Sequence, residues 1–345
     1  MRKKIGYIFI GLLLIGAILG LMTYNAIWSD NVNDASVKSQ TLDIPAGSDF
    51  DAVVDIMTRE NILKNVTTFK QVAKLMKYDR SKVPSGRYKI DRDWNNRQLI
   101  STLRAGRQEP ITVTFNNHRT LVETLGDIAS YLEVDSTTLV NHVTASETLA
   151  KYGYSPETML TMFIPNTYEM YWNYSPDKLL ERMKSEHKAF WAANNRLAKA
   201  AALGLTDAEV YTLASIVEME SQAAKERPII AGLYLNRLER GIPLQADPTV
   251  VYAVGDFSIR RVLNKHLAHD NPYNTYKYGG LPPGPIYLPS IQSIDAVLNP
   301  ADHDYIFMCA KPGYNSEHAF AKTSAEHSRN ANKYRSWLTS EGIRK

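Results

Sequence analysis

The feature that most constrains this chain of 345 residues is an apolar run near its start. Residues 5–22 form a stretch of 18 residues without a charge, about the length that an α-helix needs to cross a hydrocarbon core. The basic residues 2–4 precede the run, and the first acidic residue after it is Asp30. This asymmetry predicts that the N-terminus stays in the cytoplasm and that the rest of the chain lies outside it.

A cleaved signal peptide is the alternative for this run. Its apolar part would be shorter, and an Ala-x-Ala cleavage site would follow it. Residues 23–28 instead read Thr-Tyr-Asn-Ala-Ile-Trp, with aromatic side chains suited to a membrane interface. We therefore expect a cytoplasmic stub and retained anchor over residues 1–28 and a polar tether over residues 29–40. The protein would be single-pass in the cytoplasmic (inner) membrane, with its folded part on the far side.

Composition argues against several classes of function. The formal net charge is +4, and residues 2–4 supply three of these charges, so the folded part has no charge excess that would suit a nucleic acid. The single cysteine, Cys309, allows neither an intrachain disulfide nor a thiolate metal site. The chain contains no His-Glu-x-x-His motif, no serine-nucleophile signature and no phosphate-binding glycine loop. We expect no cofactor, no metal and no nucleic-acid partner.

The order of the expected elements suggests a small subdomain followed by a larger domain. Residues 41–45 and 86–90 predict strands, whereas residues 49–57 and 69–76 predict helices. This βααβ order resembles a LysM-type module, a class that binds cell-wall glycan in other proteins, although a structural spacer would show the same pattern. A connecting helix near residues 96–105 completes a subdomain over residues 41–109.

Residues 110–345 predict a larger mixed α/β domain, which makes the whole chain α+β with a single N-terminal transmembrane helix. Residues 111–115 have the β-branched alternation of a strand, and Ser175-Pro176 opens a long helix. Residues 163–169 (Phe-Ile-Pro-Asn-Thr-Tyr-Glu) form a motif-like turn that either ends a strand or lines a cleft.

The candidate catalytic residue lies on a helix expected to start at the capping-box pattern of residues 206–209. Glu218 and Glu220 lie about 200° apart on this helix, so they cannot face one pocket. Glu218 shares its flank with small and polar residues, whereas Glu220 shares its flank with Leu213 and Ile216. We therefore expect Glu218 to line a cleft and Glu220 to face away from it. A solvated surface carboxylate is the alternative for Glu218.

Several short motifs, in fixed order, resemble those of the endolytic murein transglycosylase (YceG-like) family. They are residues 214–218 (Ala-Ser-Ile-Val-Glu), 236–238 (Asn-Arg-Leu), 244–252 (Leu-Gln-Ala-Asp-Pro-Thr-Val-Val-Tyr), 271–276 (Asn-Pro-Tyr-Asn-Thr-Tyr), 280–286 (Gly-Leu-Pro-Pro-Gly-Pro-Ile) and 318–320 (His-Ala-Phe). The resemblance covers nearly the whole chain. It implies that Glu218 is catalytic, that the substrate is the nascent glycan strand of peptidoglycan, and that peptidoglycan synthases are partners.

The resemblance also implies a lytic transglycosylase reaction at the MurNAc–GlcNAc bond, which terminates strand elongation. Glycosidases ordinarily use two carboxylates, and this sequence offers one well-placed Glu. In a single-carboxylate mechanism, Glu218 protonates the glycosidic oxygen and then accepts the proton of the sugar's own 6-hydroxyl, which closes a 1,6-anhydro ring. The carboxyl needs a raised pKa for this role, most simply from a partly apolar setting. A lysozyme-type hydrolase with Asp247 as second carboxylate, and a non-catalytic cell-wall-binding scaffold, are the alternatives.

The substrate-binding candidates combine aromatic faces, which stack on sugar rings, with polar groups that bond sugar hydroxyls. They are Ser215, Gln245, Asp247, Tyr252, Tyr273, Asn274, Thr275, Tyr276, Pro282 and Pro283. Half-buried packing is the alternative for each tyrosine. His318 and His327 match no metal motif, and we expect them to support the cleft.

Overall fold

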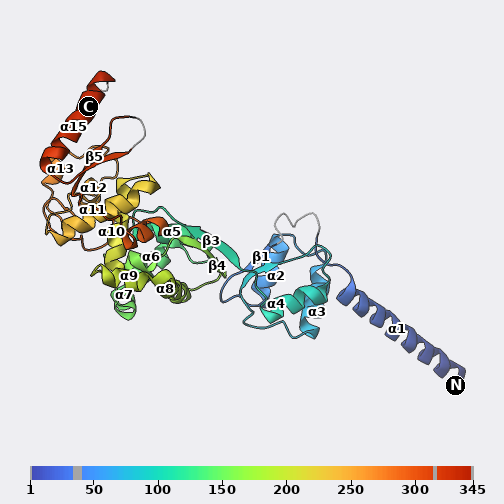
Figure 1. Cartoon of the computed structure of the whole chain (residues 1–345). Coiled ribbons are helices and arrows are strands. Elements are labelled where there is room, and N and C mark those ends of the chain that lie inside the picture. Colours follow the sequence, from blue (N-terminus) through green and yellow to red (C-terminus); the bar gives the residue numbers. More distant parts are fainter. Residues whose placement is uncertain (1, 34–40, 314–316, 343–345) are drawn as a thin grey trace. The chain divides into compact units, whose positions relative to one another are not determined.

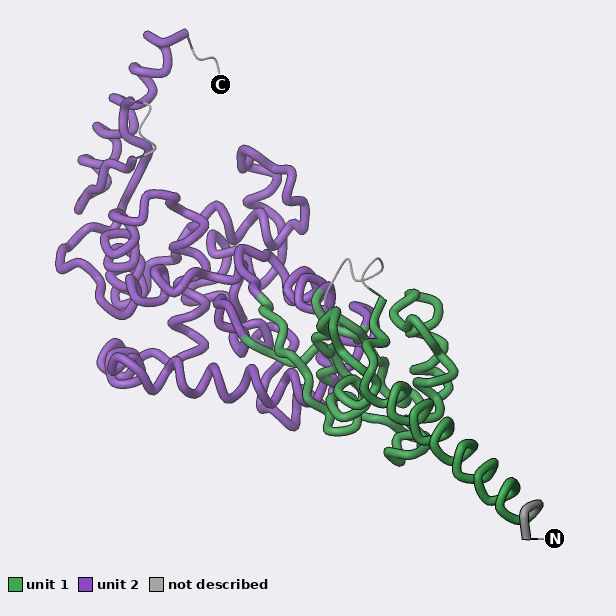
Figure 2. Tube along the Cα trace, turned by 90° about the vertical axis from the view of Figure 1, so that its right-hand side faces the viewer, with its two compact units in different colours: residues 1–113, 131–134, 169–174 green, residues 114–130, 135–168, 175–345 purple. Residues whose placement is uncertain are grey.

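The structure is a computed structural model that describes residues 2–33, 41–313 and 317–342. Helices dominate it, with short strands between them, which confirms a mixed helix and strand fold with an N-terminal apolar helix (Figure 1). The chain divides into two compact units (Figure 2). Unit 1 comprises residues 1–113, 131–134 and 169–174, and unit 2 comprises residues 114–130, 135–168 and 175–345.

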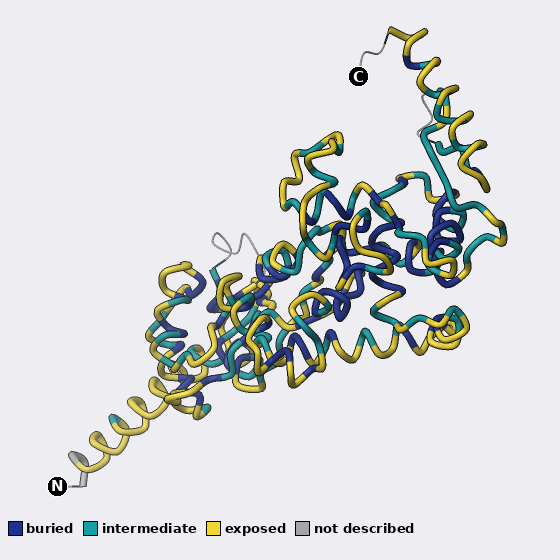
Figure 3. Tube along the Cα trace, turned by 90° about the vertical axis from the view of Figure 1, so that its left-hand side faces the viewer, coloured by how far each residue is buried: buried dark blue, intermediate teal, exposed yellow. Residues whose placement is uncertain are grey.

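The first helix of unit 1 has the properties of a membrane span. Helix α1 (Arg2–Trp28) contains the segment Ile5–Trp28, in which an 18-residue window has a mean hydropathy of 2.5. Most residues of this segment are exposed (Figure 3). Among the described residues it is the single unbroken helix that is long and apolar enough to cross a membrane. The predicted anchor is therefore present as a continuous helix.

The rest of unit 1 has the expected βααβ order. Its elements are β1 (Thr41–Ile44), α2 (Phe50–Arg59), α3 (Val66–Leu75), β2 (Gly86–Lys89) and a following helix, α4 (Asn96–Ala105). The two strands pair antiparallel, with Thr41 opposite Lys89 and Ile44 opposite Gly86. Each helix begins at a side-chain cap, from Asp49, Asn65 or Asn95. Buried side chains from all five elements form one apolar core.

The chain after α1 is bonded to unit 1. Asp30 and Val32 form isolated β-bridges with Asn95 and Leu63. The buried Asn31 side chain donates to the Asn96 side chain at 2.7 Å. The predicted tether covers residues 29–40. Residues 34–40 lie outside the described residues, so this part of the tether stays a prediction.

Most of unit 2 is helical. The elements from residue 111 onward are β3 (Ile111–Phe115), α5 (Leu121–Tyr131), α6 (Ser136–Thr144), α7 (Ser146–Tyr152), the 3-10 helix η1 (Met159–Met162), β4 (Asn166–Met170), α8 (Pro176–Ala192), η2 (Ala193–Asn195), α9 (Arg196–Ala202), α10 (Asp207–Glu220), η3 (Ala224–Glu226), α11 (Arg227–Glu239), α12 (Asp247–Val254), α13 (Asn264–Leu267), α14 (Ile291–Leu298), β5 (Phe307–Ala310), β6 (His318–Ala321) and α15 (Ser324–Ser340). Strands β3 and β4 form one two-stranded sheet, and β5 and β6 form another.

Helix α10 forms the centre of unit 2. It begins at the predicted capping box, in which the Thr206 and Glu209 side chains bond each other's backbone N–H groups. Every residue from Val210 to Val217 is buried, because α11, α12 and α14 pack around the helix. The middle of α10 is thus buried on all sides, whereas its first turn, residues 207–209, and its last turn, residues 218–220, are partly or fully exposed.

Candidate active site

The last turn of α10 directs two carboxylates into two different cavities. Glu218 lines one of about 470 Å³, and Glu220 lines another of about 350 Å³. The expectation that the two cannot share a pocket is confirmed. Glu220 faces away from the Glu218 cavity, as expected, but a second cavity, which the sequence did not predict, opens at its carboxylate.

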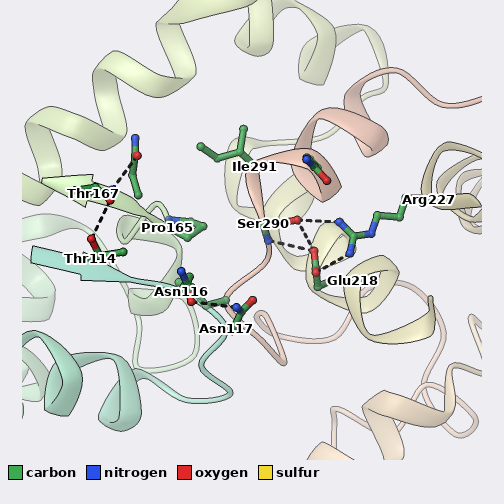
Figure 4. A pocket seen from close by; sticks show the side chains of 12 residues that line it. Thr114, Asn116, Asn117, Pro165, Thr167, Glu218, Arg227, Ser290 and Ile291 are labelled. Atoms are coloured by element: carbon green, nitrogen blue, oxygen red, sulfur yellow. Dashed lines mark hydrogen bonds and ion pairs between the residues drawn. The ribbon is translucent and has the colours of Figure 1, made fainter. Parts of the chain in front are cut away.

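The Glu218 carboxylate is held in a buried ion pair (Figure 4). Its Oε1 accepts a hydrogen bond from Arg227 Nη2 at 2.8 Å. Its Oε2 accepts from the hydroxyls of Ser290 and Ser293, both at 2.5 Å, and from the Ser290 backbone N–H at 3.2 Å. The Glu218 and Arg227 side chains are 12% and 10% exposed. Both carboxylate oxygens are thus engaged in bonds that join α10, α11 and the start of α14.

Opposite the ion pair, the Glu218 cavity is lined by neutral polar side chains together with the apolar Pro165, Leu288 and Ile291. Thr114 and Thr167 lie across from Glu218 in Figure 4, and their hydroxyls are 2.8 Å apart. Pro165, Asn166 and Thr167 show that the motif-like turn of residues 163–169 lines this cavity. Amides and hydroxyls of this kind can bond sugar hydroxyls.

The Glu220 cavity is richer in ionisable side chains. Its polar lining consists of Glu220, Tyr234, Arg237, Gln245, Asp247, Tyr276, Cys309, His318 and His327. Strand β5, helix α11 and the segment before α12 supply apolar walls. Acid, base and hydrogen-bonding groups therefore meet in one cavity.

Glu220 has the protonation behaviour that a general acid needs near neutral pH. Burial of its carboxyl group raises its pKa to about 7. The Tyr234 hydroxyl, which donates to Glu220 Oε1 at 2.6 Å, acts in the opposite direction. The negative charge of Asp247 raises the pKa further, and the charge of His318 lowers it. At neutral pH a substantial fraction of Glu220 is protonated, and it can both give and take a proton.

His318 is held by a buried carboxylate. Glu226, which is 5% exposed, accepts from the His318 backbone N–H at 2.9 Å and pairs with His318 Nδ1 at 2.8 Å. Ser221, just past α10, donates to the same carboxylate at 3.2 Å. The pair fixes the imidazole at the edge of the Glu220 cavity.

Asp247 and Gln245 are also held in place. The Tyr276 hydroxyl donates to Asp247 Oδ1 at 2.6 Å. Gln245 accepts from Arg237 Nη2 at 2.7 Å and has a φ of 52°, in the left-handed region that favours glycine. Such strain costs on the order of 1–3 kcal/mol and often marks a functional site.

The remaining substrate-binding candidates line neither cavity. Ser215, Asn274 and Thr275 are fully buried and bonded within the protein, for example Ser215 Oγ to the Thr212 carbonyl at 2.7 Å. The rings of Tyr252 and Tyr273 pack against each other, with centroids 4.7 Å apart. Pro282 is buried and Pro283 is exposed. Their roles in binding stay predictions. Among the described residues, no group of three His, Cys, Asp or Glu side chains could hold a metal ion.

Sequence reasoning missed several residues around the two carboxylates. Arg227, Ser290 and Ser293 enclose Glu218, and Tyr234 and Glu226 adjust the Glu220 cavity. The Asn-Arg-Leu motif of residues 236–238 pointed to α11 without singling out Tyr234. No local pattern marks the two serines, since serine at a helix start is common as a cap.

Comparison with known proteins identifies the family. The sequence profile described as the YceG-like family matches residues 42–333. The chain belongs to the YceG-like family. It is 29% identical over 335 residues to the endolytic murein transglycosylase of Bacillus subtilis, covering 91% of this chain and 90% of that relative. It is 26% identical over 325 residues to the endolytic murein transglycosylase of Streptococcus pneumoniae, covering 86% of this chain and 58% of that longer relative.

A solved structure of a family member has the same fold. The crystal structure of a YceG-like protein from Listeria monocytogenes aligns with a TM-score of 0.54 and 25% identity, covering 84% of this chain and 97% of that one. The family membership that the sequence motifs predicted is therefore confirmed.

Proposed function

We propose that this YceG-like chain is an endolytic murein transglycosylase, a lyase that cuts peptidoglycan glycan strands between MurNAc and GlcNAc. The names of the relatives from B. subtilis and S. pneumoniae support this activity. The observation that carries the proposal is the Glu220 cavity, where a carboxyl group with a pKa of about 7 lies beside Asp247 and His318.

We assign the acid–base role to Glu220. The Glu218 assignment stays a prediction, but the Glu218 oxygens already accept bonds from Arg227, Ser290 and Ser293. Glu220 accepts a hydrogen bond from Tyr234, and its cavity contains three of the substrate-binding candidates, Gln245, Asp247 and Tyr276.

The reaction needs two proton transfers, one from the Glu220 carboxyl group and one back to it. Protonated Glu220 donates to the oxygen that joins MurNAc C1 to GlcNAc, and the C1–O bond breaks as GlcNAc leaves with its 4-hydroxyl. Positive charge develops at C1 and is stabilised by the nearby Asp247 carboxylate. The Glu220 carboxylate then accepts the proton of the MurNAc 6-hydroxyl as O6 bonds to C1. The product is a 1,6-anhydro ring, Glu220 is protonated again, and no water is consumed.

A lysozyme-type hydrolase is the second candidate, because Glu220 and Asp247 line one cavity and a pair of carboxylates suffices for hydrolysis. Digestion of peptidoglycan in water enriched in oxygen-18 distinguishes the two. We expect unlabelled 1,6-anhydro ends, since the attacking oxygen belongs to the sugar. Labelled reducing ends as the main product would show a hydrolase and overturn the lyase proposal.

The organisation of the chain suits this activity. With basic residues 2–4 in the cytoplasm, α1 would hold the catalytic domain, assigned to residues 110–345, outside the inner membrane, where peptidoglycan lies. Synthases that extend the strands are the partners to expect for an enzyme that ends them. The paired βααβ strands of residues 41–109 support the LysM-like assignment. Co-sedimentation of a detergent-solubilised Glu220→Gln protein with insoluble peptidoglycan, with and without Lys89→Glu, tests whether this subdomain adds to binding.

A further inference from the structure

A groove of about 500 Å³ runs between the membrane helix α1 and helix α3. Its walls are mainly apolar and include Leu19, Met22 and Ala26 of α1 and Val72 and Leu75 of α3. Leu75 is 64% exposed, although it ends a helix in which Phe69, Val72 and Ala73 are buried. The groove and Leu75 are apolar surface that the protein itself leaves uncovered.

The last turn of α1 is bonded to the rest of unit 1, so the position of α3 along α1 is fixed. Ala26 and Ile27 pack against the unit 1 core. The Asn96 side chain donates to the Ala26 carbonyl at 2.8 Å, and the Arg97 guanidinium lies 4.7 Å from the centre of the Trp28 ring. These contacts hold the last turn of α1, at the end of the groove that Ala26 lines.

The length of α1 then fixes where the groove lies across the membrane. A hydrocarbon core about 30 Å thick takes about 20 helical residues. Counted from Ile5, the first apolar residue after the basic stub, the core ends near Tyr24. Leu19 and Met22 lie inside this span, and the α3 residues across the groove from them lie at the same level. An upright α1 therefore carries the end of α3 into the outer leaflet.

The charge of α3 matches that position. The helix contains Lys70 and Lys74 and no acidic residue, and Lys74 lines the groove next to Leu75. Lysine at the edge of a hydrocarbon layer extends its ammonium group to lipid phosphates, and such contacts favour an anionic membrane.

We propose that the α1–α3 groove binds a phospholipid of the outer leaflet, with an acyl chain against Val72 and Leu75 and its phosphate at Lys74. Unit 1 then rests in the membrane surface and is not held above it. The inference rests on α1 spanning the membrane and does not depend on the catalytic assignment.

Site-specific fluorescence in lipid vesicles tests this inference. The full-length protein carries Cys309→Ser, which removes its only cysteine, and either Leu75→Cys or, as control, Asp55→Cys on the exposed face of α2. Each cysteine is labelled with an environment-sensitive nitrobenzoxadiazole dye. The protein is reconstituted into vesicles of phosphatidylcholine with or without phosphatidylglycerol, and no other protein is added.

We expect the label at position 75 to show blue-shifted emission and to lose most of its intensity when lipids spin-labelled near the headgroup are included. The label at position 55 should show neither effect. Stronger quenching at position 75 in phosphatidylglycerol, reduced by Lys74→Glu, would support the phosphate contact, and its absence would overturn that part. Equal, water-like emission at both positions would overturn the proposal, as would burial of position 75 only after other membrane proteins are added, which would indicate a partner helix.

Discussion

At the scale of single residues, the Glu220 cavity is an arrangement for setting one pKa. Burial raises the pKa of Glu220 to about 7, and the charge of His318 opposes that rise. Glu226 keeps His318 in place through two contacts. Because an acid must be protonated to act, cutting should decline as the pH rises through the pKa of Glu220.

The first prediction follows from the effect of His318 on the pKa of Glu220. His318→Gln removes a charge that lowers the pKa of Glu220, so the alkaline limb of the pH–rate profile should move to higher pH. Glu226→Gln should move it in the same direction by weakening the hold on His318. Profiles of peptidoglycan cutting from pH 5 to 9 measure this. His327→Gln is the matched control, because His327 lines the same cavity without being among the groups that shift Glu220.

If the alkaline limb of the pH–rate profile stays where it is in both variants while only the maximal rate falls, His318 has a structural role only.

The residue-level candidates could be predicted only in part from the sequence. Motif order grouped Gln245, Asp247 and Tyr276 with Glu218 in one expected cleft, whereas they line the Glu220 cavity. The choice between Glu218 and Glu220 depended on how many hydrogen bonds each carboxylate already accepts within the protein. That property is set by Arg227, Ser290 and Ser293, which lie up to 75 residues away.

At the scale of elements, α10 is an inner helix whose end is tied to two neighbours. Its start was predictable, because a capping box is a local pattern. Its burial on all sides was not, since α11, α12 and α14 come from later segments of the chain. A helical wheel assumes one buried face, and that assumption fails here.

The ion pair at the end of α10 gives the second prediction. Removing one partner of a buried pair costs about 3–5 kcal/mol, because the other charge is left uncompensated. Glu218→Gln and Arg227→Gln should each lower the melting temperature, and the double variant should lose less than the sum of the two. Thermal melting of the four proteins forms the cycle. Additive losses would contradict the structural role assigned to this pair.

At the scale of the whole molecule, the order of anchor, βααβ elements and larger domain could be predicted because each has its own periodicity. Which segments of the chain make up unit 1 could not be predicted. Residues 131–134 and 169–174 belong to unit 1. The Ala46 backbone N–H donates to Glu133 Oε1 at 2.7 Å, and the Asn173 side-chain amide donates to Ser85 Oγ at 2.8 Å. No local pattern reveals contacts between segments 88 residues apart.

The central claim is that Glu220 carries the proton that cuts the strand. The most direct measurement compares anhydro-muropeptide release from peptidoglycan by the parent, Glu220→Gln and Glu218→Gln proteins at pH 7, each corrected for its folded fraction by thermal melting. We predict that folded Glu220→Gln loses about 100-fold or more, the usual contribution of a general acid–base group, and that folded Glu218→Gln retains most of its activity. Near-parental release by folded Glu220→Gln, together with an inactive but folded Glu218→Gln, would contradict the account and return the catalytic role to Glu218.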